Sequence, residues 1–218
     1  MKYKIKHSTT YNYSDFVSLC QNQARLTPKT NRGQICHSSR IEIEPTPTYL
    51  QTFTDYFNNQ VTAFEIAIQH KKLKVTMISE VELLVGANSN LESVDIAWRK
   101  VRDLLVKPNT AELLKTSEFV LPSQLIPIDK GIKEYALISF DAHKNIISAC
   151  KDLMARIFHE FHYDPGFTTI STPLSTVFAQ KRGVCQDFAH FALACLRSVG
   201  LAGRYVSGYI ETMPPEGE

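Results

Sequence analysis

The stretch RGVCQDFAHFALACLRSVGLAGRYVSGY, residues 182–209, contains an amphipathic helical pattern with a cysteine at its start. Apolar residues recur at the spacing of one helical face, at Phe188, Ala192, Cys195, Leu196 and Val199. Gly200 then supplies a stop signal. The pattern therefore predicts a helix from about residue 184 to residue 199, with Cys185 in its first turn.

This position gives the Cys185 thiol a chemical role. The first N–H groups of a helix lack intrahelical acceptors, and the positive end of the helix dipole lies beside them, so both stabilise an anion. The thiolate is the nucleophilic form of cysteine. The same N–H groups can bind the oxyanion that forms when a thiolate attacks an acyl carbon. Cys185 is therefore the candidate catalytic residue, and Gly183 allows the backbone before it to turn sharply.

The other thiols are interpreted as small hydrophobic residues. They are Cys20, Cys36, Cys150 and Cys195. An odd number of cysteines without a CxxC pair favours neither a disulfide framework nor a zinc site. His159 and His162 are three residues apart, but no third ligand has matching spacing, so we predict no metal and no cofactor. Cys195 lies about 15 Å along the helix from Cys185, beyond disulfide reach, which argues against a redox pair.

Spacing alone does not identify a base for Cys185. His190 is five residues along the helix and is therefore rotated about 140° away from Cys185. Asp187 is rotated about 200° away and is better explained as an acidic residue that stabilises the first helical turn. The other histidines precede the cysteine, and none has a neighbour placed to orient it.

Composition excludes several classes of protein. The 218 residues carry 24 Lys and Arg against 22 Asp and Glu, a net charge of +2 without the basic patch of a nucleic-acid binder. The N-terminus has no apolar leader, and no run approaches the roughly 20 apolar residues that span a bilayer. We expect a cytoplasmic protein that contacts a peptide or protein substrate and neither nucleic acid nor membrane.

The first third of the chain alternates in polarity, as strands with one solvated face do. The alternating runs are residues 3–7, 41–43, 61–68 and 73–81, and the breakers Pro28, Pro45 and Pro47 fall between them. This pattern predicts an antiparallel sandwich or barrel. Its isolated histidines (His7, His37 and His70) are interpreted as surface or hydrogen-bonded core residues.

Helical spacing begins beyond Gly86. Ser93 is expected to cap a helix that ends at Lys107-Pro108, and a shorter helix is expected from Thr110. Residues 119–138 are expected to form an irregular connector. Asp141 is expected to cap a longer helix whose buried stripe is Ile146, Ile147, Cys150, Leu153, Met154, Ile157, Phe158 and Phe161.

Several motifs together resemble the bacterial transglutaminase-like superfamily. In the second half they are Tyr163-Asp164-Pro165-Gly166-Phe167-Thr168, Thr172-Pro173, residues 182–190 and residues 203–209. In the first half, His7, Thr9, Tyr11 and Tyr13, residues 25–28 and residues 55–59 resemble the β-rich region that precedes the core in these proteins. The resemblance covers most of the chain.

The resemblance implies an α+β fold: an N-terminal antiparallel β domain (residues 1–88), a helical connector (89–140) and a papain-like core (141–218). In that core a helix bearing the nucleophile packs on an antiparallel sheet, and Cys185 matches the nucleophile. The family's histidine and aspartate follow the segment that matches Tyr205 to Tyr209, in His-Ala-Trp-like and Asp-Pro-like motifs that this sequence does not contain. The core is therefore expected to be truncated at its C-terminal end, with the base supplied by residues outside this chain.

The implied chemistry is acyl transfer through a cysteine thioester. Water as the acceptor gives a protease or amidase, which we favour. A lysine amine as the acceptor gives a protein-glutamine acyltransferase that forms cross-links. A catalytically inactive peptide-binding module would keep the cleft and the cysteine without the base.

Overall fold

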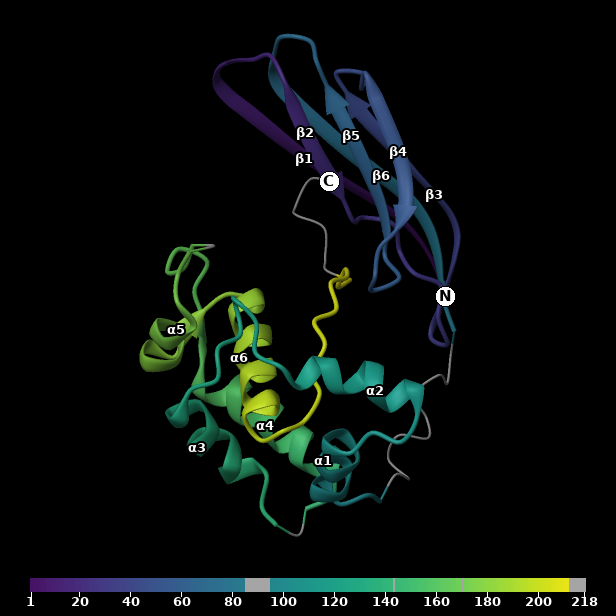
Figure 1. Cartoon of the computed structure of the whole chain (residues 1–218). Coiled ribbons are helices and arrows are strands. Elements are labelled where there is room, and N and C mark those ends of the chain that lie inside the picture. Colours follow the sequence, from purple (N-terminus) through teal and green to yellow (C-terminus); the bar gives the residue numbers. More distant parts are fainter. Residues whose placement is uncertain (85–94, 143, 170, 212–218) are drawn as a thin grey trace. The chain divides into compact units, whose positions relative to one another are not determined.

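The computed structural model describes residues 1–84, 95–142, 144–169 and 171–211 (Figure 1). The chain divides into two compact units, Met1–Ser89 and Asn90–Glu218. The first unit is built of strands and the second mainly of helices, which is the predicted α+β composition. The predicted domain boundaries after residues 88 and 140 stay predictions.

The first unit consists of two three-stranded antiparallel sheets. One has the order β1 (Lys2–Val17), β6 (His70–Leu83), β3 (Gln34–Glu44), and the other β2 (Cys20–Ala24), β5 (Gln60–Ile66), β4 (Tyr49–Thr54). Phe64 and Ile66 of β5 form one apolar cluster with Leu73 and Val75 of β6. The two sheets therefore share a core, and of the two predicted alternatives, an antiparallel sandwich or a barrel, the first unit is the sandwich.

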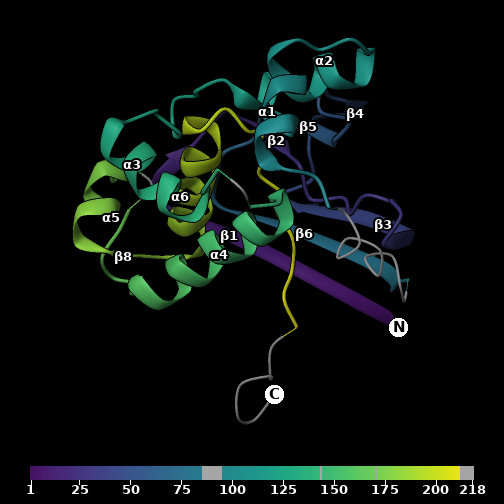
Figure 2. The same ribbon diagram turned by 90° about the horizontal axis from the view of Figure 1, so that it is seen from below.

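Helices dominate the second unit, and α6 packs against α3, α4 and α5 (Figures 1 and 2). The elements are α1 (Trp98–Val106), α2 (Ala111–Ser117), the 3-10 helix η2 (Glu118–Val120), α3 (Lys130–Ser139), α4 (Ile146–Glu160), β7 (His162–Tyr163), α5 (Leu174–Gln180), β8 (Arg182–Gly183) and α6 (Cys185–Ser198). No helix among the described residues has both the length and the apolar character needed to cross a membrane.

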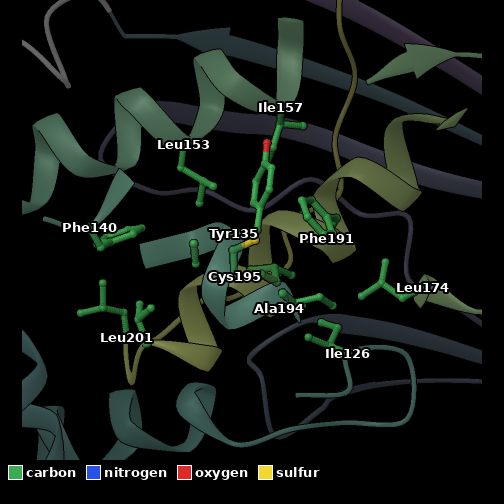
Figure 3. Close-up of a cluster of buried hydrophobic side chains, with 14 of the residues drawn as sticks. Ile126, Tyr135, Phe140, Leu153, Ile157, Leu174, Phe191, Ala194, Cys195 and Leu201 are labelled. Atoms are coloured by element: carbon green, nitrogen blue, oxygen red, sulfur yellow. The ribbon is translucent and has the colours of Figure 1, made fainter. Parts of the chain in front are cut away.

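One buried cluster joins these helices (Figure 3). Tyr135 of α3, Leu153 of α4 and Phe191 and Cys195 of α6 all contribute to it, and Trp98 of α1 belongs to the same cluster. Burial raises the pKa of the Cys195 thiol to about 12. Cys195 is therefore an inert core residue, as the helical stripe predicts.

The prediction of an irregular connector over residues 119–138 is wrong. Helix α3 begins at Lys130 because the Asp129 carboxylate accepts hydrogen bonds from the N–H groups of Gly131 (2.7 Å) and Ile132 (3.2 Å). The helix then buries Ile132, Tyr135, Ala136 and Ser139, which recur at helical spacing. The Asp129 cap followed by this short apolar stripe is a local sequence signal for the helix.

Two helix starts also differ from the prediction. Helix α1 begins at Trp98, because Ala97 forms an antiparallel bridge with Asn145; the proposed cap Ser93 lies outside the described residues. Helix α4 begins at Ile146 and is capped by Asn145 rather than Asp141, since the Asn145 side chain accepts from Ser148 N–H at 2.7 Å. The shorter helix from Thr110 is confirmed as α2, with Thr110 as its cap.

The predicted buried stripe of α4 is correct only in part. Leu153, Ile157 and Phe161 are buried, together with Ala149, whereas Met154 and Phe158 are 67% and 80% exposed. Only one stripe of the helix faces the cluster, and the apolar residues beside that stripe point to solvent.

The antiparallel sheet expected in the core is absent from the described part of the second unit, where β7 and β8 form a two-residue parallel pair. The segment from Tyr205 to Ile210 has no regular secondary structure, and the Val206 and Ile210 side chains are 81% and 86% exposed. Among the described residues, this segment pairs with no strand, so it does not add to a sheet.

The turn between β4 and β5 depends on one carboxylate. Asp55 Oδ1 accepts from the N–H groups of Phe57 (3.0 Å) and Asn59 (2.8 Å), and Oδ2 accepts from Asn59 Nδ2 (3.0 Å) and Arg25 Nε (3.1 Å). Burial alone would raise the pKa of Asp55, but hydrogen bonds from Asn59, Arg25 and Phe57 lower it to about 2.

A lowered folded-state pKa gives stability that is present above the unfolded value, about 3.9, and is lost as the pH falls toward 2. We therefore expect the thermal midpoint of the chain to fall between about pH 4 and pH 2, and Asp55→Asn to remove part of this dependence. Circular dichroism melts across this range measure the effect. Asp15→Asn, at an exposed strand position, is the matched control; an unchanged pH dependence in Asp55→Asn would contradict the prediction.

Candidate active site

Helix α6 begins at Cys185, as the helical pattern predicts. The Cys185 residue is exposed, whereas Cys195 is buried and Cys20, Cys36 and Cys150 are partly buried. Among the described residues, the Cys185 thiol makes no hydrogen bond and no ion pair. An exposed thiol at the start of a helix is open to a substrate and lies at the positive end of the dipole.

The first turn of α6 is held by Asp187. Its Oδ2 accepts from Val184 N–H at 2.8 Å and from the Thr168 hydroxyl at 2.7 Å. This confirms that Asp187 stabilises the first helical turn. It also ties the helix to the loop that contains Thr168, a partner that the sequence did not indicate because it is 19 residues away.

The residue before the helix leaves the first N–H groups of α6 open. Val184 occupies the N-cap position, and its aliphatic side chain cannot accept a hydrogen bond from the first turn. A serine or aspartate at this position would occupy one of these donors. The donors beside Cys185 are thus left for an anion such as a developing oxyanion.

Gly183 has a different role from the one expected. A Cβ atom at this position would lie 2.7 Å from Asp187 Oδ2 and 2.9 Å from Asp187 Cβ, so the glycine makes room for the carboxylate. The sharp turn in the backbone lies two residues before Gly183, at Lys181, whose φ of 52° is left-handed.

A short parallel pairing fixes the segment that leads to Cys185. His162 N–H donates to Lys181 C=O at 2.7 Å, and Asp164 N–H donates to Gly183 C=O at 2.8 Å. The Arg182 guanidinium pairs with Asp164 and holds the pKa of that carboxyl below its usual range. The motif around Asp164 and the motif around Cys185, separate in the sequence, therefore form one structural unit.

The His190 ring is not placed to act as a base for the Cys185 thiol in this structure. Its ring packs against Tyr205, with the two ring centroids 5.4 Å apart, and burial lowers its pKa. The ring makes no hydrogen bond among the described residues. This agrees with its predicted place on another face of the helix.

The fold and the site together define a class of α+β proteins with an exposed thiol in the first turn of a largely buried helix. The chain belongs to the bacterial transglutaminase-like family. Residues 3–82 match the bacterial transglutaminase-like N-terminal region, and residues 138–215 match the transglutaminase-like superfamily core.

Two mycobacterial relatives are similar to nearly the whole chain. An uncharacterized protein of Mycobacterium tuberculosis is 34% identical over 223 residues, an alignment that covers 100% of this chain and 68% of that protein. An uncharacterized protein of Mycobacterium leprae is 33% identical over 210 residues, covering 95% of this chain and 70% of its own.

A solved structure has the same fold. The crystal structure of a "Putative Cysteine Protease" from Cytophaga hutchinsonii superposes with a TM-score of 0.67 at 18% identity. The match covers 91% of this chain, which spans 63% of the length of that protein.

The exposure of the five thiols generates a first test of the site. At pH 7, we expect iodoacetamide to label Cys185 well before the others, because it is exposed at a helix N-terminus and burial raises the pKa of Cys36, Cys150 and Cys195. Mass spectrometry of the labelled peptides measures the order. Labelling of Cys150 or Cys195 at a comparable rate would show the assignment to be wrong.

The contact between Gly183 and Asp187 generates a second test. Gly183→Ala should displace the carboxylate and lower the free energy of unfolding by about 1–2 kcal/mol, the size of a lost helix cap. Alkylation of Cys185 should slow in the same variant. Gly208→Ala is the matched control, since a Cβ there would meet no atom within 4 Å. Equal stability of the two variants would refute the packing argument.

Proposed function

We propose that this protein is a cysteine hydrolase of the transglutaminase-like family that cleaves peptide or amide bonds, with Cys185 as its catalytic nucleophile. The observation that carries the proposal is the exposed thiol in the first turn of α6, beside N–H groups without intrahelical acceptors. Membership of the family and the name of the Cytophaga neighbour support the same kind of chemistry.

The proposed reaction has two stages. The Cys185 thiolate attacks the carbonyl carbon, a C–S bond forms, and the carbonyl electron pair becomes an oxyanion beside the N–H groups of the first turn. The oxyanion then collapses, the C–N bond breaks, and a general acid gives the departing amine its proton. Water next attacks the thioester, which releases the acid product and returns the sulfur as the leaving group.

The proton transfers need a group that the described residues do not bring to the thiol. His190 packs on Tyr205, and among the described residues no histidine forms a hydrogen bond with Cys185. We propose that the acid–base histidine and the aspartate that orients it belong to segments outside residues 1–218. The mycobacterial relatives support this, since the alignment covers 68% of the M. tuberculosis protein.

Water is the proposed acceptor of the acyl group. Hydrolysis and cross-linking share the thioester and differ only in whether water or an amine attacks it. The proposal includes a peptide or protein substrate and a cytoplasmic location, and it requires no metal or cofactor.

The proposal is tested on the full-length gene product with a broad peptide mixture. Cys185→Ala should reduce cleavage to background and leave the thermal midpoint nearly unchanged, because the side chain is exposed and unpartnered among the described residues. His190→Ala should cost about 1 kcal/mol of stability through its lost packing on Tyr205 and keep most activity per folded molecule.

Three outcomes would contradict the proposal. The first is cleavage of peptides by a Cys185→Ala protein. The second is loss of cleavage by a fully folded His190→Ala protein, and the third is transfer of the acyl group to a primary amine in place of hydrolysis.

A further inference from the structure

The Lys181 ammonium lies among aromatic rings from four helical elements of the second unit. Its Nζ is 4.2 Å from the ring centroids of Tyr135 (α3) and Phe178 (α5), 4.5 Å from that of Phe161, which caps α4, and 5.6 Å from that of Phe191 (α6). Cations are attracted to the faces of aromatic rings, and more strongly where water is excluded. The Lys181 side chain is 33% exposed, so about two thirds of its surface is withdrawn from water.

An ion pair completes this environment. Lys181 Nζ lies 3.8 Å from Glu160 Oε2, and Glu160 Oε1 accepts from Arg156 Nε at 3.2 Å. The Arg156 guanidinium is in turn held by Tyr135 C=O at 2.8 Å. Glu160 therefore connects the lysine to α4 by charge, while the rings hold it by packing.

The backbone of Lys181 has an uncommon conformation. Its φ of 52° and ψ of 37° are left-handed, a region that favours glycine and is strained for a residue with a side chain. Such a conformation persists only where the surrounding structure holds it. The ring cluster and Glu160 supply that hold, which explains a lysine at a helix end where glycine is usual.

The same residue begins the segment that carries the thiol. Lys181 C=O accepts from His162 N–H at 2.7 Å, β8 follows directly, and Cys185 starts α6 four residues later. From these contacts we infer that Lys181 is a positioning residue for Cys185. The four rings and Glu160 hold its ammonium, and this fixes the backbone turn that places the thiol in the first turn of α6. The inference rests on the proposed function only in the claim that the position of Cys185 matters for catalysis.

Two substitutions distinguish a positioning effect on Cys185 from an electrostatic effect on its thiolate. Lys181→Met gives an unbranched side chain that is shorter by one heavy atom, and it keeps the strain of the backbone but removes the cation. Glu160→Gln removes the anion that faces the lysine. A purely electrostatic effect on the thiolate would have opposite signs in the two variants, since one loses a positive and the other a negative charge. A positioning effect has the same sign in both.

The readout is the pH profile of Cys185 alkylation by iodoacetamide in the folded chain. We expect both variants to slow the reaction at pH 7 by about threefold, the size of a helix-terminus contribution to an anion, and to move the profile to higher pH. The slowing should persist in 1 M salt, which screens exposed charges more than about 3 Å apart but screens partly buried pairs such as Lys181 and Glu160 much less. Lys181→Arg should restore the rate.

Lys130→Met is the matched control. Lys130 also lies 3.8 Å from a glutamate, Glu134, but its side chain is 90% exposed. Its removal should leave the profile unchanged. An unchanged alkylation profile in Glu160→Gln would overturn the inference, and so would opposite effects in Glu160→Gln and Lys181→Met. If Lys181→Met does not fold, the direction of the change in Glu160→Gln alone tests the inference.

The proposed function is judged by a separate measurement. If Cys185→Ala keeps full activity in the full-length protein, the proposed hydrolase fails, while the alkylation profiles still decide whether Lys181 positions the thiol.

Discussion

The Asp187 carboxylate is the constraint on which the candidate site depends. One oxygen accepts from the backbone of Val184 and from the Thr168 hydroxyl, so a single group joins the helix start to the neighbouring loop. It fits only because Gly183 has no Cβ. Without this carboxylate the first turn would be free to fray, and the donors beside Cys185 would lose their fixed direction.

The rest of α6 gives this turn a rigid base. Phe191, Ala194 and Cys195 are fully buried in the cluster shared with α3, α4 and α5. Beyond them Arg197 is buried and donates to Gly203 C=O at 2.8 Å and to Leu121 C=O at 3.0 Å, which fixes the chain after the helix. A reactive group on a packed helix is held more accurately than one on a loop.

Much of this arrangement could be predicted where the causes are local. The bounds of α6, the place of Cys185 in its first turn and the role of Asp187 all follow from helical period and first-turn chemistry. The cap at Asp129 is an equally local signal, but Pro127, two residues earlier, favours an irregular segment. In contrast, nothing near Met154 or Phe158 in the sequence distinguishes them from the buried Leu153 and Ile157, because only the position of the neighbouring helices decides which stripe is covered.

By itself, therefore, the sequence determined the antiparallel strands of the first unit, the helix that begins at Cys185 and the family motifs, since these depend on residue type at short spacing. The tertiary structure alone decided that Thr168 reaches Asp187, that the motif at Asp164 pairs with Gly183, and that the Lys181 ammonium lies among four rings. These contacts join residues far apart in the chain, and their partners are chosen by how the helices pack, for which short-range periodicity carries no signal.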